Sequence, residues 1–175
     1  MLKSVWVAVV LFASGYAAAA ENHYSTPVGT VIVDVDSNWS EMSSLPDGLE
    51  GIGFQVDNGK TMQFVLGTFK DLPAGGIDRG TLRALTNDLR RSHAQEKFAV
   101  SEELMTVSGS NFTGYYCLAT NPASMPAPGR FKYQYTGFVS VGSNPMMFVI
   151  GWNSGGKTAA DRALATLNRM RIKDR

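Results

Sequence analysis

The chain has 175 residues, with 16 lysine and arginine side chains against 15 acidic ones and a formal net charge of +1. This near-neutral balance disfavours nucleic acid as a partner, because phosphate backbones select a strongly basic surface. A single cysteine excludes an intrachain disulfide, so stability has to come from a hydrophobic core, which a chain of this length can build.

Residues 1–20 have the composition of a secretory signal peptide. Lys3 precedes an apolar stretch over residues 5–12, and four alanines ending at Ala20 stand before the first acid, Glu21. A basic start, a short apolar segment and small residues at the cleavage point are the three parts of such a signal. The sequence therefore predicts cleavage near Ala20 and a periplasmic or secreted protein.

The alternative, a membrane anchor, would need about 18 consecutive apolar residues. Ser14 and Gly15 interrupt the apolar run, and the only cysteine, Cys117, is too far along the chain for a lipid anchor at the cleavage point. We expect no membrane anchor and one mature domain, residues 21–175. Loss of Lys3 would leave that domain with 15 basic and 15 acidic side chains.

The first half of the mature chain predicts a loose N-terminal arm, residues 21–29, followed by a strand over residues 31–35 and a β-hairpin. Trp39, after the strand, is expected to pack inward. In the hairpin, apolar side chains alternate with small or polar ones at Ile52, Phe54 and Val56 and again at Met62, Phe64 and Leu66. Asn58-Gly59 lies between the two runs and is typical of a type I′ turn, which needs positive φ angles.

The second half predicts two helices and four more strands. Asp78 can cap a helix with Leu82, Leu85 and Leu89 inward and Arg83, Arg90 and Arg91 in solvent. Strands are expected at residues 98–107, 111–119, 133–141 and 146–150, the last central in a sheet, and a closing helix at residues 158–171. This order predicts an α+β fold, an antiparallel β-sheet with helices packed on it.

Residues 151–158 match the phosphate-loop pattern GxxxxGK[ST]. A nucleotide site also needs a parallel α/β sheet and a second strand with an acidic Mg²⁺ ligand, and the predicted fold provides neither. We interpret Gly155-Gly156 as a turn, with Thr158 as the cap of the closing helix and Asp161 completing a capping box.

No other motif in the sequence predicts catalysis, a cofactor or a metal. Asp34, Asp36 and Asn38 begin like a calcium loop, but Trp39 stands where that loop needs glycine. The two histidines, His23 and His93, do not form a zinc-ligand pattern, and His93 is expected to interact with the carbonyls that end its helix. Cys117, among apolar residues, is expected to be a buried thiol.

The element order resembles the PsbP-like superfamily, whose bacterial members include the DcrB-like periplasmic proteins. The resemblance rests on an early strand followed by Trp39, the hairpin at residues 51–68, the helix at residues 79–92, the strand ending at Trp152 and the closing helix. It implies an α/β/α sandwich and a non-enzymatic protein that binds other proteins. It carries no binding residue over to this chain.

These observations together predict an exported protein-interaction module: an accessory, envelope or immunity-type protein that binds another protein. The candidate contact is the proline-rich loop at residues 121–130 with the next residue, and its candidate residues are Ser124, Met125, Pro126, Pro128 and Phe131. A loop that folds its own apolar residues inward is the competing interpretation. A small-ligand or metal-binding protein, or an enzyme with a pocket between sheet and helix, is the alternative function.

The signal-peptide interpretation predicts that the exported protein begins at Glu21 or within a residue or two of it. Intact-mass spectrometry of protein recovered from the periplasm or the medium measures this directly. Recovery of a chain that still carries Met1 would contradict export by cleavage.

Overall fold

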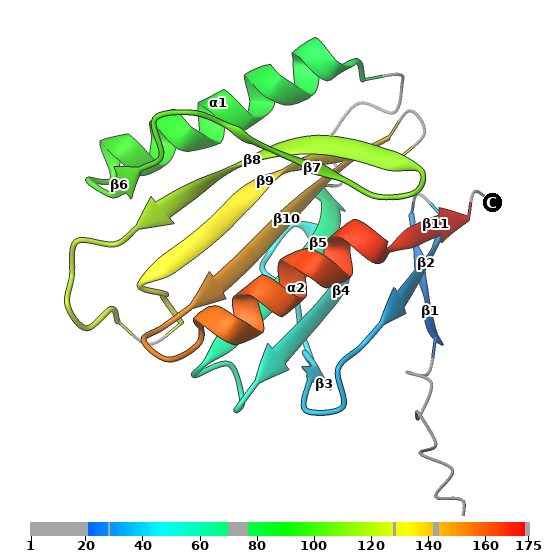
Figure 1. The fold of residues 1–175 in the computed structure, drawn as a ribbon, viewed down its shortest axis with the longest axis horizontal. Helices are drawn as coiled ribbons and strands as arrows, with labels where there is room; N and C mark the ends of the chain where they lie inside the picture. Colours follow the sequence, from blue (N-terminus) through cyan, green and yellow to red (C-terminus); the bar gives the residue numbers. More distant parts are fainter. Residues whose placement is uncertain (1–20, 28, 70–76, 128, 142–143, 174–175) are drawn as a thin grey trace, which may run out of the picture.

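The structure, a computed structural model, describes residues 21–27, 29–69, 77–127, 129–141 and 144–173. These residues form two antiparallel β-sheets and two helices (Figure 1). This is the coarse α+β architecture predicted above. The larger sheet has the strand order β3-β4-β5-β10-β9-β8-β6, and β7 also pairs with β8. Its strands are β3 (Ser40–Glu41), β4 (Leu49–Val56), β5 (Met62–Phe69), β6 (Ala99–Val100), β7 (Met105–Ser108), β8 (Phe112–Thr120), β9 (Tyr133–Val141) and β10 (Asn144–Trp152).

The smaller sheet consists of β1 (Glu21–Thr26), β2 (Gly29–Asp34) and β11 (Arg171–Lys173), with β2 in the middle. The expectation of a loose arm at residues 21–29 is wrong, because β1 pairs with β2 along its whole length. Ser25 and Thr26, which indicated a loop, are instead the last residues of β1, and the Thr26 hydroxyl donates to the Gly29 carbonyl at 2.8 Å. The end of the chain also differs from expectation, since the closing helix stops at Arg169 and β11 follows.

The predicted hairpin is present as β4 and β5, in register from Leu49↔Phe69 to Val56↔Met62. Its turn begins one residue earlier than expected. Asp57 and Asn58 have φ angles of 54° and 51°, as the two central residues of a type I′ turn require, and the Gly59 amide donates to the Val56 carbonyl at 3.2 Å. The short side chains of Asp57 and Asn58 tolerate this left-handed conformation.

The helix α1 (Arg79–Gln95) begins where the sequence predicts, with the Asp78 carboxylate accepting from the Thr81 amide at 2.7 Å. Within α1, the Leu82 side chain is fully buried, and the Thr86 hydroxyl donates a hydrogen bond to the Tyr115 carbonyl of β8 at 3.3 Å. Arg90 is not purely solvated, because its guanidinium donates to the Glu102 carbonyl. This contact ties α1 to the segment between β6 and β7, where the strand expected over residues 98–107 is interrupted.

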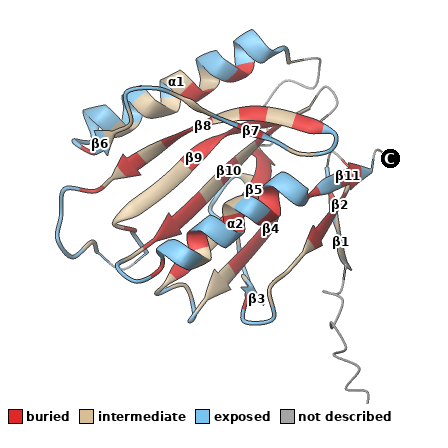
Figure 2. Cartoon of the chain, in the orientation of Figure 1, coloured by how far each residue is buried: buried red, intermediate tan, exposed pale blue. Residues whose placement is uncertain are grey.

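The helix α2 (Lys157–Arg169) covers one face of the larger sheet. Ala160, Ala163 and Leu167 are fully buried there in a cluster with Phe148 and Ile150 of β10. Figure 2 shows this burial as red bands on the central strands and on the side of α2 that faces them. β10 lies between β5 and β9, which confirms it as a central strand.

The alternate side chains of β10 point to the other face of the sheet. Met147 and Val149 are only half-buried there, so the expected two-sided cover of β10 is partial. Strand residues alternate between faces, and these positions therefore lie on the face opposite α2.

The start of α2 does not have the predicted cap. Gly156 is the N-cap and makes no side-chain cap hydrogen bond, which leaves Thr158 inside the first turn and exposed. Asp161 accepts from the Lys157 ammonium at 2.8 Å instead of completing a capping box. The pattern of a hydroxyl three residues before an acid is present, but the N-cap lies two residues before Thr158, so the helix starts too early for a capping box.

Alanine substitutions at Asp78 and Thr158 separate these two helix starts. Asp78→Ala is expected to lower the urea midpoint of unfolding, because it removes the acceptor for the Thr81 amide, whereas Thr158→Ala should leave the midpoint unchanged. The amide hydrogen bond lowers the pKa of Asp78 below its ordinary value. The contribution of Asp78 is therefore present above the carboxyl pKa of the unfolded chain and is lost as pH falls through the lowered pKa.

Urea titration of the two variants beside the parent chain, at neutral pH and again near pH 3, measures both effects. Equal midpoints for Asp78→Ala and Thr158→Ala at neutral pH would contradict the assignment of the caps.

Candidate functional site

The proline-rich loop between β8 and β9 is closed at its base by a compact set of hydrogen bonds. The Asn121 amide donates to the Lys132 carbonyl at 2.8 Å, and the Lys132 ammonium donates to the carbonyls of Asn121 and Ala123 at 2.6 and 2.9 Å. The Asn121 side chain, which is buried, accepts from the Ala123 amide at 3.0 Å. A buried amide side chain and a lysine used in this way fix the two ends of the loop to each other.

Asn153, which follows β10, attaches this base to the rest of the protein. Its side-chain oxygen accepts from the Lys132 amide at 3.0 Å, and its side-chain nitrogen donates to the Lys60 carbonyl at 3.0 Å. Its backbone amide donates to the Thr61 carbonyl at 3.2 Å. One residue therefore joins the hairpin turn, the end of β10 and the loop.

Phe131 anchors the end of the loop from inside. Its side chain is 7% exposed and lies over Gly151 of β10, where an added methyl group would overlap the ring. The expectation that Phe131 is held at the surface is therefore replaced by the competing interpretation, a loop residue folded inward. The Phe131 side chain therefore attaches the end of the loop to the sheet by packing against Gly151.

Met125 lies at the surface of the loop. Its side chain is 88% exposed, the one large hydrophobic side chain among the described residues that is exposed to this degree. Ser124 beside it is exposed and Pro126 is half-buried, while Pro128 lies outside the described residues. Of the four candidate contact residues that the structure describes, Met125 and Ser124 are the exposed ones.

Two adjoining cavities lie beneath the loop, of about 250 and 510 Å³. They share the lining residues Gln63, Gly129, Arg130 and Phe131. The first cavity is lined further by apolar residues of the sheet, and the second extends to the hairpin turn at Lys60. We call the pair of cavities the loop groove.

The sequence did not predict the loop groove, because its residues come from distant segments. One usable signal was present: Gln63, Val65 and Val149 alternate with the core residues of β5 and β10, so they belong to the second face of the sheet. No pattern along the chain indicates that the loop returns over that face.

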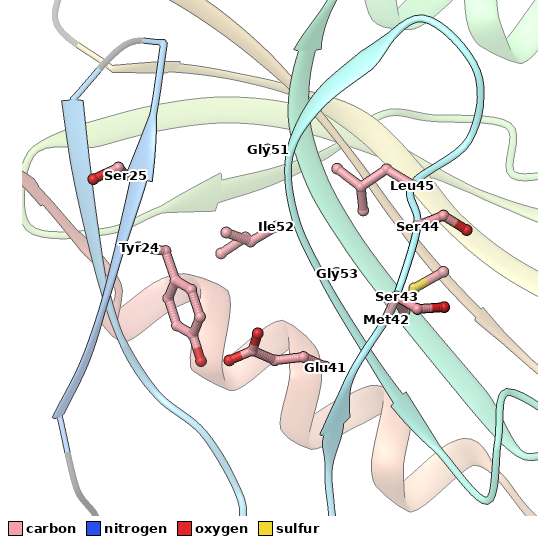
Figure 3. A pocket seen from close by; sticks show the side chains of 10 residues that line it. All are labelled: Tyr24, Ser25, Glu41, Met42, Ser43, Ser44, Leu45, Gly51, Ile52 and Gly53. Carbon is pink, nitrogen blue, oxygen red and sulfur yellow. The ribbon is translucent and has the colours of Figure 1, made fainter.

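A polar cleft of about 300 Å³ lies between β1 and the edge of β4 (Figure 3). Tyr24 of β1 and Glu41 of β3 point toward each other across it, and burial together with a hydrogen bond to Glu41 raises the pKa of Tyr24 to about 12. Ser43 and Ser44 line the same cleft. A carboxylate that faces a tyrosine hydroxyl in this way can also accept hydrogen bonds from a small cationic group. Sequence analysis missed the cleft because β1 was expected to be loose.

The residues that match the phosphate-loop pattern make interactions within the fold instead. Both sheet neighbours of β10 run antiparallel to it, so the parallel sheet of a nucleotide site does not surround the match. The Lys157 ammonium pairs with Asp161, and Asn153 is used to hold the loop. This segment functions in the structure as a connection between β10 and α2.

The remaining candidate groups do not come together. Cys117 is fully buried, as expected, and burial raises the pKa of its thiol to about 11. His93 packs its ring against Phe98, with Nδ1 buried and without a hydrogen-bond partner, and burial lowers its pKa. The Nδ1 atom of His93 therefore does not make the expected hydrogen bond to the carbonyls at the end of the helix.

Within the described ranges, no group of three or more histidine, cysteine or acidic side chains is placed to hold a metal ion. Asp36, from the calcium-like segment, instead lies 3.5 Å from the Arg162 guanidinium of α2. In the same part of the chain, neither helix is long and apolar enough to cross a membrane.

Comparison with protein-family models, with curated proteins and with solved structures finds no match for this chain. The site is therefore defined by the geometry of the loop, the loop groove and the polar cleft.

The contact between Phe131 and Gly151 predicts a strong, localised effect of adding one methyl group. Gly151→Ala is expected to cost about 1–3 kcal/mol of unfolding free energy, because a central strand cannot move away from the ring. In a Phe131→Ala background the same change should cost well under about 1 kcal/mol. Denaturant unfolding of the four chains in this double-mutant cycle gives the coupling.

Gly80→Ala is the matched control, since a methyl group at Gly80 in α1 meets nothing closer than 3.4 Å. It should be neutral or slightly stabilising. A Gly151→Ala cost that persists without the Phe131 ring would contradict the anchoring role of Phe131.

Proposed function

We propose that this chain is an exported protein-interaction module that binds another protein through the surface of the proline-rich loop. The exposed side chain of Met125 carries the proposal. A flexible, polarisable thioether on a surface loop suits contacts with a partner, and burying it would remove apolar area from water.

The fixed base of the loop supports this proposal. Binding by a free loop pays for ordering its backbone, at a cost of about 1–2 kcal/mol per residue. Here Asn121, Lys132 and Asn153 already hold the two ends, and Phe131 packs against the sheet. The loop can therefore present Met125 to a partner with less loss of conformational entropy.

The finer fold and the location belong to the same proposal. We place the chain with the PsbP-like, DcrB-like periplasmic proteins as an α/β/α sandwich. The support is that α2 packs into the main core cluster, whereas Leu82 of α1 is buried away from that cluster. Export to the periplasm or the medium is supported by the signal-peptide pattern of residues 1–20.

Photo-crosslinking tests the loop surface. With a photoreactive amino acid at Ser124, the exported protein is expected to crosslink to a discrete partner, and Met125→Asp should reduce the yield at least about ten-fold by placing a charge in an apolar contact. Unfolding free energy should change by less than about 0.5 kcal/mol, since Met125 packs little against the fold.

Ala165→Asp, on the exposed side of α2, is the control for a new surface charge and should leave the crosslink intact. If Met125→Asp and Ala165→Asp changed the crosslink yield equally, the loop would not be the contact surface.

A further inference from the structure

The loop groove lies on the face of the larger sheet opposite α2. Its floor is the second face of β5, β10 and β9, where Val65, Val149 and Gln134 alternate with residues of the core cluster. Phe131 and Leu49, the first residue of β4, add further apolar side chains to the lining. This arrangement leaves an apolar strip on a sheet face beside the loop that presents Met125.

The charged side chains that line the groove are cations. Arg130 lines both cavities and Lys60 lines the larger one, and among the residues that the structure describes no acid lines either cavity. Arg130 has one recorded acidic partner, Glu96, the residue that caps the end of α1, at 3.7 Å from the guanidinium, and both side chains of that pair are more than half exposed. A loose, exposed pair of this kind contributes little, so an incoming carboxylate can replace Glu96.

The amide side chains of the groove distinguish a peptide from an acyl chain. Gln63 and Gln134 stand on the floor between the apolar residues, and each offers both donors and an acceptor. A peptide backbone carries both kinds of group and can pair with them. A hydrocarbon chain would cover them and leave them without partners, which is unfavourable.

We propose that the loop groove binds an extended, acidic segment of the partner protein. An apolar side chain of the segment enters between Val65, Val149 and Phe131, and its flanking carboxylates pair with Arg130 and Lys60. This inference rests on the proposed function and extends it, because Pro126 and Ala127, which directly follow Met125 in the loop, line the larger cavity of the groove.

Selection from a displayed library of random peptides against the exported protein tests the groove. The enriched sequences are expected to carry aspartate or glutamate next to a leucine, phenylalanine or other large apolar residue. Fluorescence anisotropy with one labelled selected peptide then gives its affinity for the parent chain and for variants.

The double substitution Lys60→Ala with Arg130→Ala is expected to weaken that peptide at least about ten-fold. Arg83→Ala with Arg91→Ala removes two exposed cations from α1 and should change the affinity less than about two-fold. Val149→Thr keeps the shape of the strand residue while adding a hydroxyl to the apolar strip, and should also weaken binding. Circular dichroism checks that each variant is folded.

Enrichment of basic or uncharged peptides, or equal affinity for the two double variants, would overturn the inference. The inference would also be overturned if the library yielded no acidic peptide and sodium decanoate bound the groove, since an acyl anion would then be the better occupant. The two proposals can fail independently. The proposed function fails if crosslinking to the partner protein does not depend on Met125, whereas the groove proposal fails if the selected synthetic peptide does not depend on Lys60 and Arg130.

Discussion

The position of β10 between β5 and β9 is the constraint on which the rest of the structure depends. Through this strand the β4–β5 hairpin joins the strands of the second half of the chain in one sheet. One face of β10 supplies Phe148 and Ile150 to the core beneath α2, and the other supplies Val149 and Gly151 to the loop groove. Burial of such side chains stabilises by about 1.5–3 kcal/mol each, so the strand that holds the core also fixes the floor of the candidate site.

The end of β10 transmits this rigidity to the surface. Asn153 makes hydrogen bonds to Lys132 and Lys60, and Gly151 provides the space that the Phe131 ring occupies. Each hydrogen bond contributes about 1 kcal/mol, and losing the Asn153 side chain would also leave the partly buried Lys132 amide without this acceptor. A segment whose sequence matches a phosphate loop thus has a structural explanation that uses the same glycine and asparagine residues.

Local patterns in the sequence predicted the elements whose determinants are local. Alternation identified β4 and β5, and Asp78 with the leucines after it identified α1. Elements held by distant partners were missed: β1 and β11 are short strands that exist because β2 lies between them, and Ser25, Thr26 and Pro27 resemble a loop until that pairing is known. The loop was predicted correctly, but whether Phe131 faces in or out depends on Gly151, which is 20 residues away in the chain.

The overall charge and the local charge of this protein lead to different conclusions about partners. A formal net charge of +1 disfavours long polyanions, whose binding requires a basic surface over many phosphates. It does not disfavour a short acidic segment, because Lys60 and Arg130 need to act only over a few ångströms, well within a Debye length of about 8 Å. With little long-range attraction, the cations would select among partners after encounter while apolar contacts at Met125 and Val149 supply most of the affinity. A partner recognised in this way is defined by the order of apolar and acidic residues in a short segment and not by its total charge.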